Sequence, residues 1–250
     1  MSEFTHVDLC SGIGGFSLAA WWAGFQTILH CEIDPYCQKV LAKNFPEVPI
    51  HDDIHALTGI SSADLLTGGP PCQPFSNAGK RVGTADDRHL WPEMLRIIDA
   101  SRPTWCVIEN VDGFTGMALD LVWSDLESAN YEVGAVVFPA SAVGAWHRRD
   151  RLWVIAHTQS VGCGSGRSWR SLASTSGKQQ QTLSTRETPD GREYRVDQWT
   201  SEPSVDRMVP GLPSELDICR RRAIGNSIVP QQAFPVLRAI ADSLRLERSA

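Results

Sequence analysis

The sequence predicts an α/β protein built on a doubly wound, mostly parallel sheet (Rossmann-like). Short apolar runs alternate along the chain with stretches of helical spacing. The runs are nearly continuous in apolar residues, as expected for strands that are buried on both faces of a parallel sheet. The length of 250 residues, with 42% hydrophobic residues, suits one sizeable core. Right-handed crossovers would connect the strands.

The expected elements follow one another in a regular order. The runs predicted as strands are residues 5–10, 27–33, 63–69, 104–111, 131–138 and 151–157, and the helical stretches between them are 15–24, 35–45, 88–100 and 120–130. Pro35 stands where the first turn of a helix accepts proline. Beyond residue 157 the composition shifts to Ser, Gly, Thr, Gln and Arg until about residue 223, where helical spacing returns. We therefore expect an α/β domain over 1–157, a small separate region over 158–206, and a C-terminal segment over 207–250 that packs back on the domain.

Charge and cysteine usage narrow the class of protein. The net charge is −6, but residues 141–200 carry nine Lys/Arg against five Asp/Glu, so this segment could face phosphates or simply be a solvated loop. The seven cysteines include no CxxC pair, which argues against a disulfide framework and against a zinc site, and we expect no metal. No apolar run approaches the ~20 residues of a membrane helix, and the first residues lack the features of a signal peptide, so we expect a cytoplasmic protein.

Three successive strand ends carry groups suited to a nucleoside. A Gly-rich turn, "SGIGG", joins the first strand to the first helix, where the backbone can approach a ligand. Glu32 ends the second strand, where an acidic side chain commonly bonds ribose hydroxyls, and Asp53 in "HDDI" is placed for an adenine amino group. The spacing is GxGG and not GxGxxG, which favours a nucleoside cofactor without a pyrophosphate and disfavours a nicotinamide dehydrogenase.

The stretch "GGPPCQPFS" places Cys72 after the next strand, between prolines. A nucleophilic cysteine must be exposed, held still and partly thiolate, and the prolines supply rigidity; the alternative is a buried, inert thiol. Glu109 follows an apolar strand in "VIENV", where it either lies in solvent or has a raised pKa and donates a proton. Arg149 and Arg151 in "HRRDR" are two positions apart at the start of a strand, so we expect both side chains on one face of the sheet. They either recognise an anion or the edge of a base, or they lie at an exposed strand end without such a role.

Taken together, "DLCSGIGGFSLA", "CEID", "DDI", "GGPPCQPFS", "ENV", "HRRDR" and "AIGNSIVPQ" resemble, in order and spacing, the motifs of the cytosine-C5 DNA methyltransferases. The likeness covers residues 5–157 and about 203–240. It implies a compact bacterial or phage enzyme that uses S-adenosylmethionine and flips its target cytosine out of double-stranded DNA. It also implies a catalytic domain over 1–157 with a short target-recognition region over 158–206. A monomer is expected, without membrane contact, at the nucleoid, and a cognate restriction endonuclease could accompany it.

The resemblance assigns roles residue by residue. Cys72 would add to C6 of the cytosine, Glu109 would bond and protonate N3, and Arg149 and Arg151 would hold the base and neighbouring groups. The positions that match the family's cofactor site are Asp8, Cys10, Gly12, Gly14, Glu32, Ile33, Asp53, Ile54, Pro71, Leu90, Asn226 and Ser227. The chain departs from the family pattern at Cys10, usually phenylalanine, and at Trp146 and His147, usually Pro-Gln.

Two rival functions stay open at this stage. The RNA branch of the same family methylates cytosine in transfer RNA with nearly the same motifs. A catalytically silent DNA-binding or cofactor-binding relative is disfavoured, because Cys72, Glu109 and both arginines are all present.

Overall fold

The computed structural model describes residues 4–71, 90–111, 117–145, 147–158, 186–187, 193–194 and 214–249. The strands are β1 (Phe4–Leu9), β2 (Phe25–Cys31), β3 (Ile50–His51), β4 (Leu65–Gly68), β5 (Trp105–Val111), β6 (Tyr131–Phe138), β7 (Arg151–Thr158), β8 (Arg186–Glu187) and β9 (Glu193–Tyr194). The helices are α1 (Gly15–Ala23), α2 (Pro35–Asn44), α3 (Trp91–Ser101), α4 (Met117–Ser128), the 3-10 helix η4 (Ala140–Val143), α6 (Ser214–Asn226) and α7 (Pro230–Arg248).

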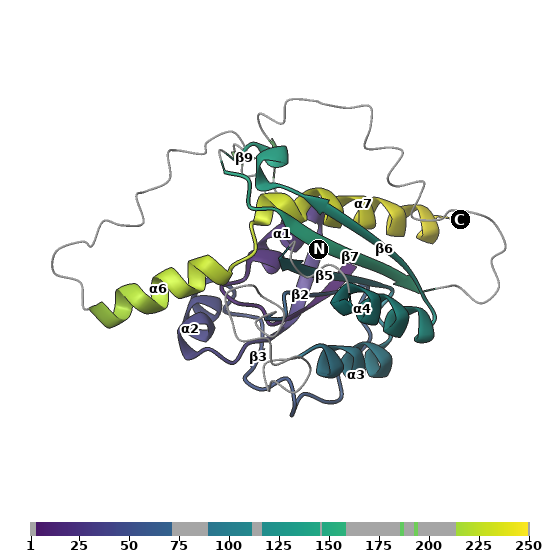
Figure 1. The fold of residues 1–250 in the computed structure, drawn as a ribbon, viewed down its shortest axis with the longest axis horizontal. Helices are drawn as coiled ribbons and strands as arrows, with labels where there is room; N and C mark the ends of the chain where they lie inside the picture. The colour runs from purple at the N-terminus through teal and green to yellow at the C-terminus, as the bar shows by residue number, and fades with distance from the viewer. Residues whose placement is uncertain are drawn as a thin grey trace.

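Seven strands form one mixed sheet in the order β3-β2-β1-β4-β5-β7-β6 (Figure 1). All pairs from β3 to β5 are parallel, and β7 runs antiparallel to both of its neighbours. The predicted fold class is therefore confirmed, and the expected strands are present with ends that differ by a few residues. The strand order reverses at β1, because β2 lies on one side of it and β4 on the other. Ligands of open α/β sheets bind at such a switch point, outside the carboxyl ends of the strands.

Local sequence signals explain the helix ends nearest this edge. Asp34 caps α2: its Oδ1 accepts the amide of Tyr36 at 2.8 Å and that of Cys37 at 3.4 Å, and Pro35 occupies the first turn. Gly24, with φ of 99°, ends α1 in the left-handed conformation that a side chain disfavours.

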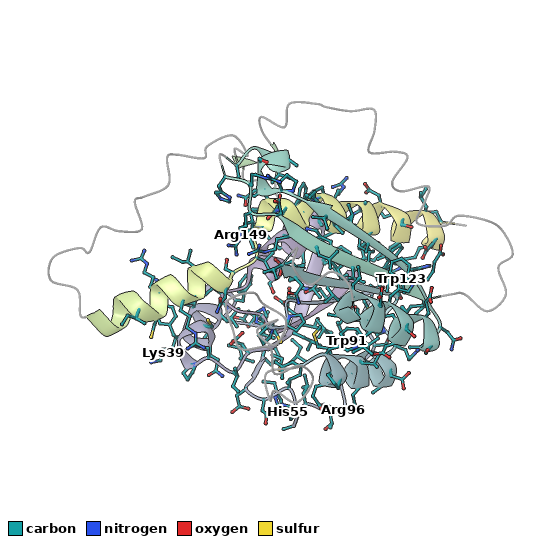
Figure 2. The ribbon with its side chains drawn as sticks, viewed as in Figure 1. Lys39, His55, Trp91, Arg96, Trp123 and Arg149 are labelled. Carbon is teal, nitrogen blue, oxygen red and sulfur yellow. The ribbon has the colours of Figure 1, made fainter. Side chains whose placement is uncertain are left out.

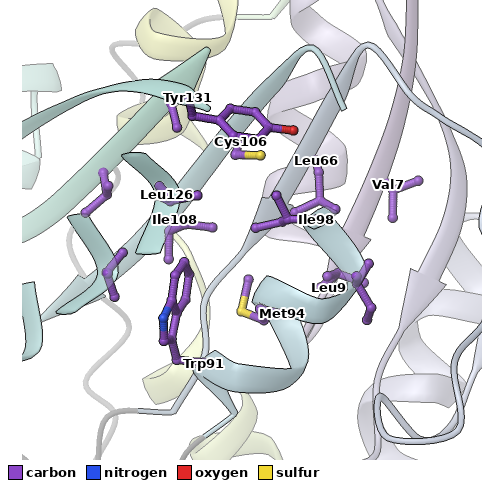
Figure 3. Close-up of a cluster of buried hydrophobic side chains, with 14 of the residues drawn as sticks. Val7, Leu9, Leu66, Trp91, Met94, Ile98, Cys106, Ile108, Leu126 and Tyr131 are labelled. Atoms are coloured by element: carbon purple, nitrogen blue, oxygen red, sulfur yellow. The ribbon is translucent and has the colours of Figure 1, made fainter. Parts of the chain in front are cut away.

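Helices cover both faces of the sheet and form two cores. On one face, α3 and α4 pack Trp91, Met94, Ile98 and Leu126 against the sheet, as Figure 3 shows. On the other face, α1 and α7 pack together, and α7 buries Leu237, Ile240, Ala241 and Leu244. The last helix thus contributes to the same core as the first strand. Burying one such aliphatic side chain contributes roughly 1.5–3 kcal/mol.

The 158–206 region lies almost entirely outside the described residues. Within it the structure describes one short antiparallel pair, in which Arg186 is opposite Tyr194. The boundaries expected for the three parts of the chain remain predictions.

Candidate active site

The carboxyl ends of the parallel strands bring the predicted site residues to one edge of the sheet. The Gly-rich turn follows β1, Glu32 follows β2, Asp53 follows β3, and Gly69 follows β4. Glu109 lies near the end of β5. Because β7 runs in the opposite direction, its first residue, Arg151, reaches this edge too: it is opposite Val111, the last residue of β5.

Glu32 holds the Gly-rich turn through its carboxylate. Its Oε2 accepts the amide of Gly12 at 2.7 Å, and its Oε1 accepts the amide of Asp34 at 2.8 Å. Each carboxylate oxygen has further acceptor capacity for a ligand hydroxyl. Gly12 has φ of 55°, and a methyl group built on it would meet no atom of the described residues within 4 Å. Open space therefore borders the turn at Gly12, which fits a nucleoside beside the carboxylate.

Gly14 and Cys10 in the same turn have different surroundings. A methyl group on Gly14 would lie 2.6 Å from the Phe45 ring and 3.1 Å from Leu41, so this glycine permits packing against α2. Cys10, where the family usually has phenylalanine, adopts the left-handed region with φ of 52°. Burial raises the pKa of its thiol, so Cys10 is not a candidate nucleophile.

Asp8 lies below the turn, fully buried, within a chain of polar side chains. Its Oδ2 accepts from Ser17 at 2.7 Å and its Oδ1 from Thr67 at 2.9 Å. These hydroxyls also contact two buried histidines, since His6 Nε2 lies 2.7 Å from Thr67 Oγ1 and His30 Nε2 lies 2.9 Å from Ser17 Oγ. With Asp8 ionised, each hydroxyl spends its one hydrogen on the carboxylate, so the Nε2 of each histidine carries a hydrogen and donates.

The geometry gives Asp8 a supporting position. Burial raises the pKa of Asp8 to about 7, while hydrogen bonds from Ser17 and Thr67 offset part of that rise. Its side chain is fully buried, so a cofactor contact predicted for Asp8 would have to come from its backbone.

The remaining predicted cofactor residues differ in how exposed they are. Ile33 is 74% exposed and presents apolar surface beside Glu32, and Pro71 and Asn226 are exposed as well. Asp53 is partly exposed, with its Oδ1 accepting the amide of His55 at 2.9 Å. The others are less accessible: Ile54 is buried, and Leu90 and Ser227 are partly buried.

Arg96 on α3 fixes the loop that carries Asp53. Its two Nη atoms donate to the carbonyls of Ile54 at 2.9 Å and Leu57 at 3.1 Å, and its Nε donates to Glu93 at 2.7 Å. Figure 2 shows Arg96 and His55 on the same side of the molecule. Arg96 therefore positions the loop that follows β3 and carries Asp53.

Glu109 and Arg151 form an ion pair of 2.6 Å between Oε1 and Nε. They occupy diagonal positions on paired strands, where long side chains of one face meet. Only 12% of the Glu109 side chain and 15% of the Arg151 side chain are exposed. Burial raises the pKa of Glu109, and Arg151 and Arg149 offset part of that rise. A largely buried carboxylate with a raised pKa can hold a proton for a substrate atom.

Cys72 lies outside the described residues, but the segment that leads to it is anchored beside Glu109. A methyl group on Gly69 would lie 3.5 Å from Glu109 Oε2. The Nδ2 of Asn110, which is buried, donates to the carbonyl of Pro70 at 3.3 Å. The two residues of the "EN" pair thus flank the backbone that leads to the predicted nucleophile.

The other described cysteines are poor nucleophiles or lie elsewhere. Burial raises the pKa of Cys31 and Cys37 to about 12, and it raises the pKa of Cys106 as well. Cys219 is exposed and lies on α6.

Arg149 lies close enough to Arg151 and Glu109 to interact with both electrostatically, but strand alternation is not the reason. Strand β7 begins at Arg151, and Arg149 lies before it with φ of 38°, so strand alternation does not extend to it. Its Nη2 donates to the carbonyls of Gly225 at 3.0 Å and Ser227 at 2.8 Å. The substituted position Trp146 lies outside the described residues, and His147 is partly buried.

Four supporting residues were missed by sequence reasoning: Arg96, Asn110, Ile228 and Gln232. Two of them left a signal in the sequence. Asn110 is a polar residue inside a strand pattern, and Gln232 is a polar residue one position before the apolar series of the last helix. The partners of Arg96 and Ile228 come from distant segments, so no local pattern could identify them.

The family comparison agrees with this geometry. The C-5 cytosine-specific DNA methylase family matches residues 4–205. The chain therefore belongs to this family of cytosine-C5 methyltransferases, and the recognition from its motifs is confirmed.

Individual relatives give the same result. The chain is 36% identical over 159 residues to the type II methyltransferase M2.BsuMI of Bacillus subtilis, covering 60% of this chain and 41% of that protein. It is 34% identical over 163 residues to the type II methyltransferase M.MspI of Moraxella sp, covering 62% and 39%. The crystal structure of a Spodoptera frugiperda DNMT2 mutant superposes with a TM-score of 0.54 at 26% identity, covering 65% of this chain and 52% of that one.

The matched region spans well under half the length of these two curated relatives. Within the described ranges, no helix is long and apolar enough to cross a membrane. In the same ranges, no group of three or more His, Cys, Asp or Glu side chains could hold a metal ion.

Proposed function

We propose that this protein transfers a methyl group from S-adenosylmethionine to C5 of cytosine in double-stranded DNA. The observation that carries the proposal is the buried Glu109–Arg151 pair, which lies beside the backbone leading to Cys72 at the carboxyl edge of the sheet. Family membership supports the same chemistry.

The cofactor would bind over the Gly-rich turn. The Glu32 carboxylate has acceptor capacity left for ribose hydroxyls, the exposed Ile33 offers an apolar surface to the adenine, and Asp53 lies at the next strand end. The open space at Gly12 would receive the rest of the molecule. When bound, S-adenosylmethionine supplies an electrophilic methyl group.

The protein's own residues would activate the cytosine. The Cys72 thiolate adds to C6, and Glu109 bonds and protonates N3 so that the addition creates no isolated anion. Arg151 pairs with Glu109 and holds the base. Electron density then moves to C5, the carbon that is methylated. Loss of the C5 proton, departure of the Cys72 sulfur as a thiolate and return of the N3 proton to Glu109 restore the aromatic ring. Since a stacked base cannot reach Cys72, the cytosine must be flipped out of the duplex.

Three further features belong to the proposal. The 158–206 region would recognise the target sequence, with "RSWRS" and "GREYR" available for phosphate and base contacts. The protein would act as a monomer at the nucleoid in the cytoplasm. Because M2.BsuMI and M.MspI are type II methyltransferases, a cognate restriction endonuclease is also proposed.

A covalent trap tests the function directly. DNA that contains 5-fluorocytosine should form a stable adduct with the wild-type protein in the presence of S-adenosylmethionine. In this base fluorine replaces the C5 hydrogen, so no proton can leave from C5 and the elimination that releases Cys72 is blocked. Cys72→Ala should form no adduct, whereas the matched control Cys219→Ala, at an exposed cysteine on α6, should form it normally. An undiminished adduct with Cys72→Ala would refute the nucleophile assignment.

A second assay separates DNA from RNA as substrate. Transfer of tritiated methyl groups to duplex DNA and to transfer RNA should favour DNA, and the opposite preference would assign the protein to the RNA branch. Bisulfite sequencing of DNA from cells that express the chain would then identify the target sequence.

A further inference from the structure

Arg149 is bound through hydrogen bonds to the junction between α6 and α7. One nitrogen, Nη2, donates to the carbonyls of both Gly225 and Ser227, which uses both of its hydrogens. The backbone carbonyl of Arg149 accepts in turn from Gln232 Nε2 at 3.3 Å. All three bonds connect the start of β7 to residues 225–232, and Figure 2 shows Arg149 where α6 approaches the sheet.

The junction is a favourable place for a cation. Gly225 is in the last turn of α6, where backbone carbonyls lack partners within the helix and the helix dipole favours positive charge. Gln232 strengthens the contact because it is fully buried and also donates to the carbonyl of Phe138 at 3.1 Å. The left-handed backbone of Arg149 is a conformation that non-glycine residues adopt at a cost, and it persists where surrounding contacts hold it.

The clamped junction contacts both halves of the candidate active site through Ile228. A methyl group on Gly15, at the cofactor turn, would lie 2.7 Å from the Ile228 carbonyl oxygen. A methyl group on Gly69, ahead of Cys72, would lie 3.4 Å from Ile228 Cδ1. Ile228 is buried between these two segments.

We propose that Arg149 is a positioning residue that clamps the α6–α7 junction, so that Ile228 closes against both the cofactor turn and the segment leading to Cys72. This role differs from the contact with the flipped base that family resemblance assigned to Arg149. The inference rests on the proposed function for its consequence in catalysis, but the clamp itself can be measured without methyl transfer.

Hydrogen exchange of the protein without DNA and without cofactor tests the clamp. Arg149→Met removes the donor and keeps an unbranched apolar side chain. Amides over residues 225–232 should then exchange about tenfold faster, the fold-change expected from losing a hydrogen bond to a charged donor. The matched control is Arg148→Met: Arg148 is the preceding residue, its side chain is 83% exposed, and it pairs with Asp150. It should leave the exchange unchanged.

Calorimetric titration of S-adenosylmethionine supplies the second readout. Arg149→Met should weaken binding about tenfold through the displaced junction, and Arg149→Lys, which keeps a positive donor, should restore part of the affinity. Unchanged exchange and unchanged cofactor affinity in Arg149→Met, together with a raised KM for DNA, would overturn the clamp and return Arg149 to substrate contact.

Two outcomes need separate treatment. If Arg149→Met does not fold, Arg149→Gln decides, because its shorter neutral side chain loses the charged donor: faster exchange over 225–232 at an unaltered melting temperature supports the clamp, and unaltered exchange overturns it. If the wild-type protein does not methylate DNA, the proposed function fails, while the exchange experiment still decides the role of Arg149.

Discussion

Replacing Gly15 with alanine tests the contact between the first helix and the α6–α7 junction. The new Cβ would lie 2.7 Å from the carbonyl oxygen of Ile228 and 3.0 Å from its Cβ, both closer than ordinary van der Waals contact. The nearest atom belongs to the backbone, so a side-chain rotation cannot relieve the clash. Overpacking of this kind typically costs about 1–3 kcal/mol.

The matched control is Gly225→Ala, on α6. No atom of the described residues lies within 4 Å of a Cβ built at Gly225, so this variant gains the higher helix propensity of alanine, up to about 1 kcal/mol, without a clash among them. Gly15→Ala can gain a similar propensity term, because Gly15 is also helical. The difference in stability between the two variants therefore isolates the clash with Ile228, at about 1–3 kcal/mol.

Thermal unfolding measures this difference. A domain of this size shifts its melting temperature by about 2–4 °C for each kcal/mol, so Gly15→Ala should melt several degrees below Gly225→Ala. Cofactor titration should also show weaker binding for Gly15→Ala, because Gly15 is the last residue of the Gly-rich turn and the first of α1. Equal melting temperatures for the two variants would refute the assigned packing of Ile228.

Three other perturbations have defined outcomes. Glu109→Gln should slow methyl transfer by about 10²- to 10⁴-fold, as general-acid loss does, and a change under about twofold in single-turnover assays would exclude the carboxylate from the chemistry. Burial lowers the pKa of His6 to about 3 and of His30 to about 4, from an ordinary value of 6.5. At a pH below 6.5 these histidines bind protons in the unfolded chain but not in the folded protein. The free energy of unfolding should therefore fall as the pH falls from 6.5 to about 4. Asp8, with a pKa raised to about 7, binds a proton in the folded state over this pH range and so offsets the effect of one histidine. The free energy of unfolding should therefore change by at most about 1.4 kcal/mol per pH unit. His6→Gln should flatten the curve of melting temperature against pH, and an unaltered curve would contradict the assignment. Arg96→Met should raise the KM for S-adenosylmethionine about tenfold with kcat nearly unchanged, whereas equal losses in kcat would argue against a role confined to the Asp53 loop.

Sequence reasoning predicted the features that depend on local pattern. Apolar runs identified the strands, and the parallel order then placed Glu32, Asp53 and Glu109 at one edge, because the carboxyl ends of parallel strands coincide. The partner of each side chain was harder to predict. The Glu32 carboxylate was expected to face a ribose, and the structure adds that it also holds the Gly12 amide.

Contacts between distant segments explain what the sequence could not indicate. Arg149 was placed with Arg151 by strand alternation. It does lie near Arg151 and Glu109, but alternation does not place it there, because Arg149 has a left-handed backbone before β7 and its hydrogen-bond partners lie more than 70 positions away. Asp8 was grouped with the cofactor residues, but Thr67, from the neighbouring strand, and Ser17, from α1, enclose its carboxylate. The hydrogen-bond partners of Arg149 and Asp8 depend on which elements pack beside them in the fold, and their neighbours in the sequence do not indicate those elements.

The position of Ile228 also bears on how the protein is made. All seven strands of the main sheet are synthesised by residue 158, yet the residue that closes on Gly15 and Gly69 emerges from the ribosome about 70 residues later. A growing chain could thus assemble the sheet while the Gly-rich turn and the segment at Gly69 still lack Ile228, the residue that packs against both. Under the proposed function, competence for methyl transfer would be acquired only after Ile228 has been synthesised and has packed against both segments.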